Sequence, residues 1–164
     1  MKPIKLEISL EEQRWEDLSI EERQLAEQAV EAAERAYAPY SDFHVGAAAL
    51  LANGKIVTGN NQENAAYPSG LCAERVTLFY AGARYPDVAV RTLAIAAVAG
   101  GEIQATISPC GACRQVLLET EQRYGSPMRV LLCGKEKVVA FSSAADLLPL
   151  CFGRENLEGG KTEV

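Results

Sequence analysis

Residues 72–75 read Cys-Ala-Glu-Arg, and residues 108–115 read Ser-Pro-Cys-Gly-Ala-Cys-Arg-Gln. In each stretch a cysteine begins a segment with helical spacing of apolar residues, which predicts helices over 72–83 and 110–123. The N-terminus of a helix carries partial positive charge, which favours a thiolate over a thiol. Two helices that begin at one point would therefore bring together three thiolates, from Cys72, Cys110 and Cys113.

Three thiolates at one point are typical of a catalytic zinc site. Such a site leaves the fourth position of the metal free for water, whereas a structural zinc takes four protein ligands. Glu74 follows Cys72 by two residues, and a carboxylate there can carry a proton from that water to a substrate atom. The order Cys-x-Glu followed by Pro-Cys-x-x-Cys matches the signature of zinc nucleobase deaminases. The residues thus predict Cys72, Cys110 and Cys113 as zinc ligands and Glu74 as catalytic.

Other interpretations of the cysteines have to be weighed. A lone Cys-x-x-Cys in a cytosolic chain can be redox-active or structural. A closed four-cysteine site would recruit Cys133, which lies in an apolar run, or Cys151, which lies near the end of the sequence. Both positions are more typical of core or partly buried thiols. Glu74 and Pro109, placed beside the other cysteines, favour the catalytic interpretation.

The rest of the chain predicts the elements that surround these two helices. Ser19 and Glu22 form a capping-box signature for a helix that ends before Pro39. Apolar runs predict strands over 43–52, 55–60, 92–99, 128–133 and 138–141, and a short helix over 144–148. Asn53-Gly54 predicts a tight turn between the first two strands. This order indicates a three-layer α/β/α fold with a mixed five-stranded sheet.

Length and charge bound the functions that remain. The 164 residues suit one domain, 1–164, and the formal net charge of −6 argues against binding DNA or RNA. No run reaches the roughly 18 apolar residues of a membrane span, and Met1 to Lys5 lead into acidic residues where a signal peptide would have an apolar region. We therefore expect a cytoplasmic protein with reduced cysteines. Residues 1–18 are acidic, and the alternation of Ile4, Leu6 and Ile8 indicates an edge strand or an unpaired segment.

Residues 37–152 closely resemble the small homotetrameric cytidine deaminases. The resemblance rests on ordered blocks with matched spacing, and residues 1–18 look like an N-terminal extension added to this core. The blocks are Tyr40-Ser41-Asp42-Phe43-His44-Val45-Gly46-Ala47-Ala48, Gly59-Asn60-Asn61-Gln62-Glu63-Asn64-Ala65-Ala66-Tyr67, Cys72-Ala73-Glu74-Arg75 and Ser108-Pro109-Cys110-Gly111-Ala112-Cys113-Arg114-Gln115.

The resemblance implies roles for the cysteines and Glu74, and the charge of the site indicates one for Arg75. Cys72, Cys110 and Cys113 would bind one Zn²⁺ per subunit, and Glu74 would be the proton shuttle. Three thiolates and a hydroxide leave the metal with excess negative charge, which would weaken it as a Lewis acid. Arg75, by donating to thiolate sulfurs, would offset that charge.

The resemblance also implies a nucleoside site. Phe43 would pack on the pyrimidine, Asn61 and Glu63 would hold the ribose hydroxyls, and the backbone N–H of Ala73 would meet the pyrimidine carbonyl oxygen. A further set would be lent to the sites of neighbouring subunits, which implies a homotetramer: Ala65, Tyr67 and Phe152.

The reaction implied is hydrolytic deamination of cytidine and 2′-deoxycytidine to uridine and 2′-deoxyuridine with release of ammonia, a step of pyrimidine salvage. Blasticidin-type deaminases share the block at 108–115 but are less similar at 61–65 and 67–68. Deaminases of tRNA or deoxycytidylate typically carry histidine in the place of Cys72. A zinc-stabilised structural module is the non-enzyme alternative, and Glu74 together with the Asn61/Glu63 pair counts against it.

Overall fold

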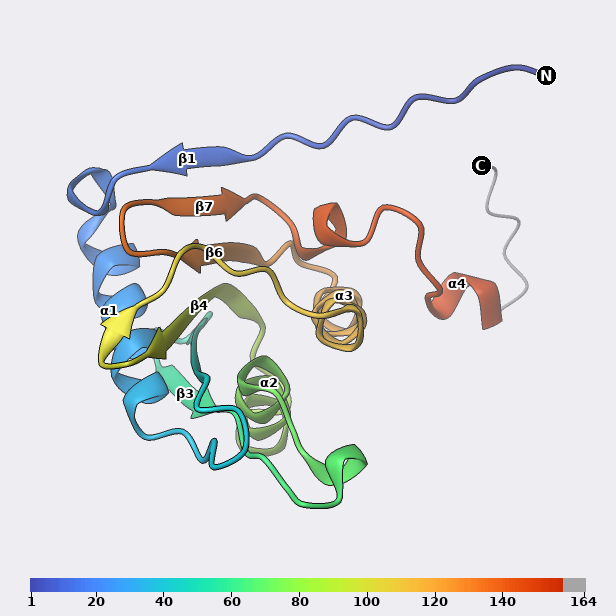
Figure 1. Ribbon diagram of the computed structural model, residues 1–164. Coiled ribbons are helices and arrows are strands. Elements are labelled where there is room, and N and C mark those ends of the chain that lie inside the picture. The colour runs from blue at the N-terminus through green and yellow to red at the C-terminus, as the bar shows by residue number, and fades with distance from the viewer. Residues whose placement is uncertain (158–164) are drawn as a thin grey trace.

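The computed structural model describes residues 1–157 and places α-helices on both faces of one mixed sheet (Figure 1). Hydrogen-bonded neighbours follow the order β1-β7-β6-β4-β2-β3, and β5 pairs with β4 beside this path. The strands are β1 (Glu11–Gln13), β2 (His44–Leu51), β3 (Ile56–Asn60), β4 (Val90–Ala99), β5 (Glu102–Ile103), β6 (Arg129–Cys133) and β7 (Val138–Phe141). The helices are α1 (Ile20–Glu34), α2 (Ala73–Arg84), α3 (Gly111–Tyr124) and α4 (Arg154–Leu157), with 3₁₀ turns η1 (Trp15–Asp17), η2 (Tyr67–Ser69) and η3 (Ala144–Leu147).

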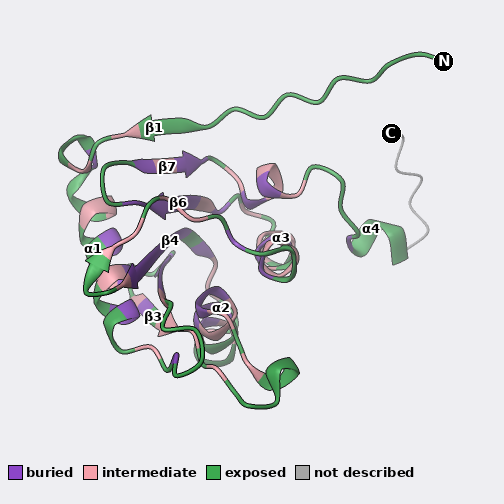
Figure 2. Cartoon of the chain, in the orientation of Figure 1, coloured by how far each residue is buried: buried purple, intermediate pink, exposed green. Residues whose placement is uncertain are grey.

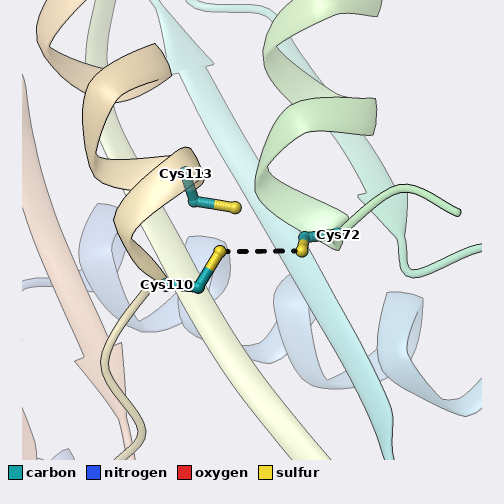
Figure 3. Close-up of side chains that lie close together, drawn as sticks. All are labelled: Cys72, Cys110 and Cys113. Carbon is teal, nitrogen blue, oxygen red and sulfur yellow. Dashed lines mark hydrogen bonds between the residues drawn. The ribbon is translucent and has the colours of Figure 1, made fainter. Parts of the chain in front are cut away.

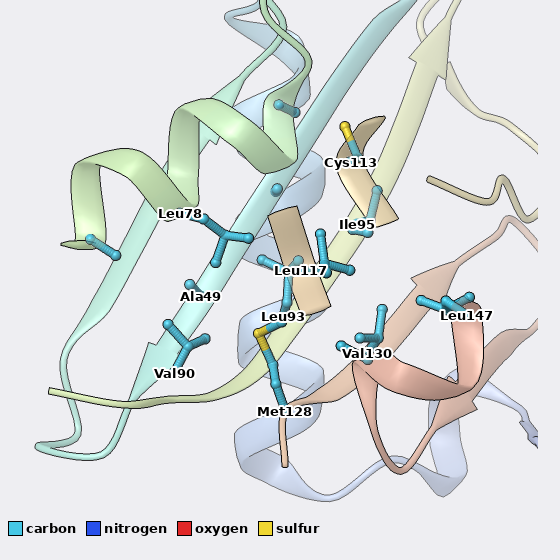
Figure 4. Packing of buried hydrophobic residues seen from close by; sticks show 14 of the residues in the cluster. Ala49, Leu78, Val90, Leu93, Ile95, Cys113, Leu117, Met128, Val130 and Leu147 are labelled. Carbon is cyan, nitrogen blue, oxygen red and sulfur yellow. The ribbon is translucent and has the colours of Figure 1, made fainter. Parts of the chain in front are cut away.

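The sheet separates two apolar clusters, and this confirms the predicted three-layer fold. Successive residues of a strand point to opposite faces, so the apolar runs of β2, β4 and β6 supply both clusters. Leu93, Ile95 and Leu117 pack between the sheet and α3 (Figure 4). On the other face, Leu25 and other residues of α1 pack against the sheet. Burial is accordingly concentrated in the central strands (Figure 2).

The sheet has seven strands over residues 1–157, where the sequence predicts five. The two additional strands, β1 and β5, are short and mostly polar, so neither contains an apolar run from which it could be predicted. Strand β5 follows a turn at Gly100 and Gly101, whose φ angles of 59° and 77° suit glycine. Strand β1 pairs antiparallel with β7 through residues 11–13, and the alternating residues before it stay outside the sheet.

Side-chain contacts tie the N-terminal segment to the sheet. The predicted capping box at Ser19 and Glu22 is present at the start of α1. Arg129 of β6 donates to Glu22 at 2.8 Å and to Glu11 at 2.7 Å. The hydrogen bond from Arg129 lowers the pKa of Glu11, and hydrogen bonds from Ser19 and Arg129 lower that of Glu22 although burial opposes them.

The strand order also sets where the helices begin. Strand β4 pairs antiparallel with β2 and parallel with β6, and α3 is the connection between the two parallel strands. Helix α2 lies beside α3 on the same face of the sheet, so the N-termini of both helices open at one edge (Figures 1 and 3). Within residues 1–157, no helix has the length and apolar character needed to cross a bilayer.

Gly46 sets how closely α1 approaches the sheet. A Cβ atom at this position would lie 2.0 Å from the carbonyl oxygen of Ala29 and 2.3 Å from the backbone nitrogen of Ala33. Backbone cannot give way as a side chain can, so we expect Gly46→Ala to lower the free energy of unfolding by about 3 kcal/mol or more. Urea denaturation measures the change. Gly111→Ala is the control, because its Cβ meets nothing within 4 Å, and equal stability of the two variants would contradict the prediction.

Candidate active site

Two helix N-termini position the cysteines predicted as metal ligands. Cys72 is the N-cap of α2 and Cys110 is the N-cap of α3, so each precedes a row of backbone N–H groups that no helical carbonyl accepts. Cys113 lies in the first turn of α3 and is buried. The three side chains point toward one another across the gap between the two helices (Figure 3).

The spacing of the sulfur atoms fits a zinc ion. All three Sγ atoms lie within 4.8 Å of one another, and Cys72 Sγ lies 3.9 Å from Cys110 Sγ. Zinc–sulfur bonds of about 2.3 Å at tetrahedral angles place two sulfurs about 3.8 Å apart. The triad therefore has the donor type and the separation that Zn²⁺ requires. Within residues 1–157, it is the only group of three or more His, Cys, Asp or Glu side chains whose ligand atoms lie close enough to hold one metal ion.

Arg75 gives the cysteine triad a positive neighbour. Its Nη2 donates to Cys72 Sγ at 3.7 Å. The pKa of Cys72 falls to about 5, because the Cys113 thiol donates to its sulfur and Arg75 adds to the effect, while burial opposes it. The same contact with Cys72, together with burial, raises the pKa of Cys113. The site thus favours negative charge on the sulfur of Cys72.

Glu74 is the buried carboxyl group of this site. It lies in the first turn of α2, directly after the buried Ala73, and its residue is only 4% exposed. Burial raises the pKa of Glu74 above its ordinary value, and the charge of Cys72 raises it further. Burial beside the thiols thus makes this carboxyl group easier to protonate than one in water.

A cavity of about 510 Å³ opens beside Cys72 and Arg75. This volume is enough for a small molecule of nucleoside size. Its wall includes an edge-to-face aromatic pair, Tyr40 and Tyr67, whose ring centroids are 6.2 Å apart. The lining residues are Tyr40, Ser41, Asn61, Gln62, Glu63, Asn64, Tyr67, Gly70, Leu71, Cys72 and Arg75.

Asn61 and Glu63 lie in this wall, and both are held by backbone groups. Asn61 Oδ1 accepts from the Val45 amide at 2.8 Å, and its Nδ2 donates to the Phe43 carbonyl at 3.0 Å. Glu63 accepts from the amide of Tyr40 at 2.8 Å. These bonds fix both side chains relative to the start of β2.

The structure brings some of the predicted substrate residues to the cavity and leaves others outside its lining. Tyr67 lines it, whereas Phe43 precedes β2 and is 37% exposed. Ala65 and Phe152 are also exposed, and neither is among the lining residues. In a single chain, the side chains of Phe43, Ala65 and Phe152 are therefore accessible to other molecules.

Sequence reasoning missed three residues that hold parts of the site in place: Ser41, Arg114 and Gln115. Ser41 Oγ donates to Glu63 at 2.5 Å, and Gln115 Nε2 donates to the carbonyl of Phe152 at 2.8 Å. Arg114 Nε donates to the carbonyl of Pro109 at 2.8 Å and so holds the loop before Cys110. Sequence spacing could not pair these residues, although each except Phe152 lies in a quoted block.

Comparisons with known proteins show which family the chain resembles. Residues 19–124 match the family described as the cytidine and deoxycytidylate deaminase zinc-binding region. A cytidine deaminase of Halalkalibacterium halodurans is 37% identical over 138 residues, which cover 84% of this chain and 98% of the relative. A cytidine deaminase of Mycobacterium tuberculosis is 42% identical over 133 residues, covering 79% and 87%.

Solved structures give the same result. The crystal structure of a cytidine deaminase from Burkholderia pseudomallei superimposes with a TM-score of 0.67 at 40% identity and covers 79% of this chain and 97% of that one. One from Mycobacterium tuberculosis gives a TM-score of 0.64 at 34% identity, covering 82% and 99%. With the matched family region spanning most of the sequence, this chain belongs to the cytidine and deoxycytidylate deaminase family of enzymes.

Proposed function

We propose that this chain catalyses the hydrolytic deamination of cytidine and 2′-deoxycytidine to uridine and 2′-deoxyuridine, with release of ammonia. The observation that carries the proposal is the cysteine triad at two helix N-termini with a buried glutamate in the adjoining turn. The triad resembles the three-cysteine arrangement of zinc nucleobase deaminases. The membership of the chain in the deaminase family supports it further.

Cys72, Cys110 and Cys113 would hold one Zn²⁺ per chain. The chemistry that zinc would supply when bound is to lower the pKa of a water molecule toward neutrality. Three thiolates carry more negative charge than the dication balances, and Arg75, at 3.7 Å from Cys72 Sγ, would offset part of it. Arg75 is therefore proposed as a positioning residue that tunes the thiolates.

Glu74 would move the protons. Its carboxylate accepts a proton from water and delivers it to N3 of the pyrimidine, which makes C4 more electrophilic. The hydroxide left by this first transfer adds to C4 and gives a tetrahedral intermediate. Glu74 then carries the proton of the new C4 hydroxyl group to the amino group, so that the C4–N bond breaks with ammonia rather than an amide anion as the leaving group. Burial suits this role, because a raised pKa makes the carboxylate a better proton acceptor than a carboxylate in water.

The cavity beside Cys72 would take the nucleoside. Asn61 and Glu63 would hold the ribose hydroxyls, since an amide and a carboxylate suit a diol, and Phe43 would pack on the pyrimidine. The backbone N–H of Ala73, at the start of α2, would meet the pyrimidine carbonyl oxygen. Three exposed residues would complete the sites of neighbouring subunits in a homotetramer: Ala65, Tyr67 and Phe152.

The setting of the reaction is part of the same proposal. We place the protein in the cytoplasm, as an enzyme of pyrimidine salvage that works on free nucleosides. Residues 1–164 would form one domain, with 37–152 as the deaminase core and 1–18 as an acidic extension. The net charge of −6 makes nucleic acid an unfavourable partner.

A substrate panel tests the reaction. Purified protein with its zinc content measured is incubated with cytidine, 2′-deoxycytidine, cytosine and blasticidin S, and ammonia release is followed. We expect rapid turnover of both nucleosides with one zinc per chain. Turnover of blasticidin S alone would overturn the substrate assignment, and no turnover by fully metallated protein would overturn the proposed activity.

Chelation separates an enzyme from a zinc-stabilised module. The two apolar clusters of the core are formed by side chains of the sheet and its helices. Cys72 and Cys113 pack in one of them, but nearly all the other packed residues lie outside the triad. We therefore expect a chelator to remove activity while the circular dichroism spectrum of the folded chain persists. Unfolding on chelation, as in small zinc domains, would favour the structural module.

A further inference from the structure

The first ten residues form an arm that runs past the end of its own sheet. Glu11 pairs with Ala140 of β7, so the next residue, Leu10, comes level with Phe141, the last residue of that strand. The preceding residues continue as an extended chain beyond β7 (Figure 1). We refer to residues 1–10 as the N-terminal arm. It lies outside the matched family region, which begins at residue 19.

Over residues 4–10 the arm has one apolar side, and the opposite side carries Lys5 and Glu7. Lys5 and Glu7 form an ion pair with each other, which places both on the same side of the extended chain. The intervening even-numbered residues therefore point the other way, and all are exposed: Ile4 by 72%, Leu6 by 57%, Ile8 by 44% and Leu10 by 54%. Strict alternation of this kind is typical of a strand that buries one face.

The sequence of the arm is complementary to itself. Residues 4–8 read Ile-Lys-Leu-Glu-Ile. In an antiparallel pair with its two-fold axis at Leu6, Ile4 of each copy stands opposite Ile8 of the other. In the same register Lys5 stands opposite Glu7, so both charged pairs are attractive.

We propose that the N-terminal arm pairs with the arm of a second copy of this chain, as an antiparallel two-stranded ribbon centred on Leu6. A two-fold axis makes the interface isologous, so that one palindromic segment supplies both halves. Backbone N–H and C=O groups along the arm gain partners that β7 is too short to supply. The even-numbered apolar side chains of the two copies line one face of the ribbon.

Proline at position 3 is compatible with this ribbon. Along an antiparallel strand, hydrogen-bonding groups that face one partner belong to alternate residues. When the even-numbered residues face the second arm, Pro3 is at an outward position, where its missing N–H costs no ladder hydrogen bond. The arm therefore carries no residue that breaks the proposed pairing.

A cysteine at the two-fold axis tests the ribbon. The Cα atoms of the two copies of residue 6 would lie about 5.5 Å apart, a separation that a disulfide spans. We expect the Leu6→Cys variant to form disulfide-linked dimers under mild oxidation, read on a non-reducing gel. Leu10→Cys is the matched control, because the two copies of position 10 would be about 26 Å apart. The unsubstituted protein gives the background from its own cysteines.

Charge reversal then tests whether the partner of the arm is the arm of a second copy. In the Leu6→Cys background, Lys5→Glu alone or Glu7→Lys alone brings like charges opposite each other, and we expect cross-linking to fall about tenfold. An equimolar mixture of these two variants makes both cross-strand pairs attractive again, so heterodimers should form at the original level. No chain in that mixture regains its own Lys5–Glu7 ion pair, so recovery reports contact between copies.

Two results would overturn the proposal. One is cross-linking of Leu6→Cys no faster than that of Leu10→Cys, which would leave the arm unpaired or bound to something other than a second arm. The other is failure of the mixture to recover. Deaminase activity is not part of the readout, so the outcome is independent of the proposed function.

Discussion

The Glu74→Gln variant is expected to bind zinc normally and to lose about 10³-fold or more in turnover of cytidine. Glutamine has the shape of glutamate, so the cysteine triad and the start of α2 should stay as they are. It cannot accept and release a proton, and removal of one general acid–base group costs about 10² to 10⁴. The proposal uses Glu74 for two proton transfers, which places the loss in the upper part of that range.

The measurement combines kcat and KM for cytidine with zinc content for each preparation. Glu119→Gln, on the exposed surface of α3, is the control for the same chemical change and should be unaffected. A zinc-replete Glu74→Gln protein that kept substantial activity would refute the proton-shuttle role. A variant that lost zinc as well would show that Glu74 supports the metal site instead.

The second large effect is expected for Cys113→Ser. Cys113 is fully buried and its sulfur completes the triad, so serine would leave two thiolates and a weakly acidic hydroxyl group. Losing a residue that only orients a ligand costs about 10 to 100-fold in metal affinity, and losing the ligand should cost more than about 10²-fold. We expect activity to fall with the zinc content, as read by a colorimetric zinc assay.

Cys133→Ser is the matched control for that variant. Cys133 is equally buried, at 1% exposed, but it lies in β6 on the α1 side of the sheet. Cys72 and Cys113 pack in the cluster on the opposite face of the sheet, so the Cys133 thiol cannot join the triad. This variant should keep zinc and activity and lose only stability. Equal zinc loss in both variants would contradict the assignment of the ligands.

Much of the fold could be predicted from local patterns in the sequence. The capping box at Ser19 and Glu22, the turn at Asn53-Gly54 and the long apolar run of β4 each depend on neighbouring residues only. The alternation of buried side chains toward two faces explains why that run is continuously apolar. The three predicted layers and five of the strands therefore needed no tertiary information.

Pairings between distant residues could not be predicted in this way. The short strands β1 and β5 have no apolar pattern, because what defines them is backbone pairing with β7 and β4. Ser41 and Glu63 are 22 residues apart, and their hydrogen bond exists only because the start of β2 and the loop after β3 meet. Sequence spacing carries no signal for such contacts.

The sequence by itself determined which residues carry the chemistry: three cysteines at two predicted helix starts, with Glu74 and Arg75 in the adjoining turn. Their spacing along the chain is a local property, so it can be recognised without coordinates. Only the tertiary structure decided that the sulfurs lie within 4.8 Å of one another and that Glu74 is 4% exposed. The packing of α2 beside α3 on one sheet face decides both, since burial and convergence depend on every element around the site.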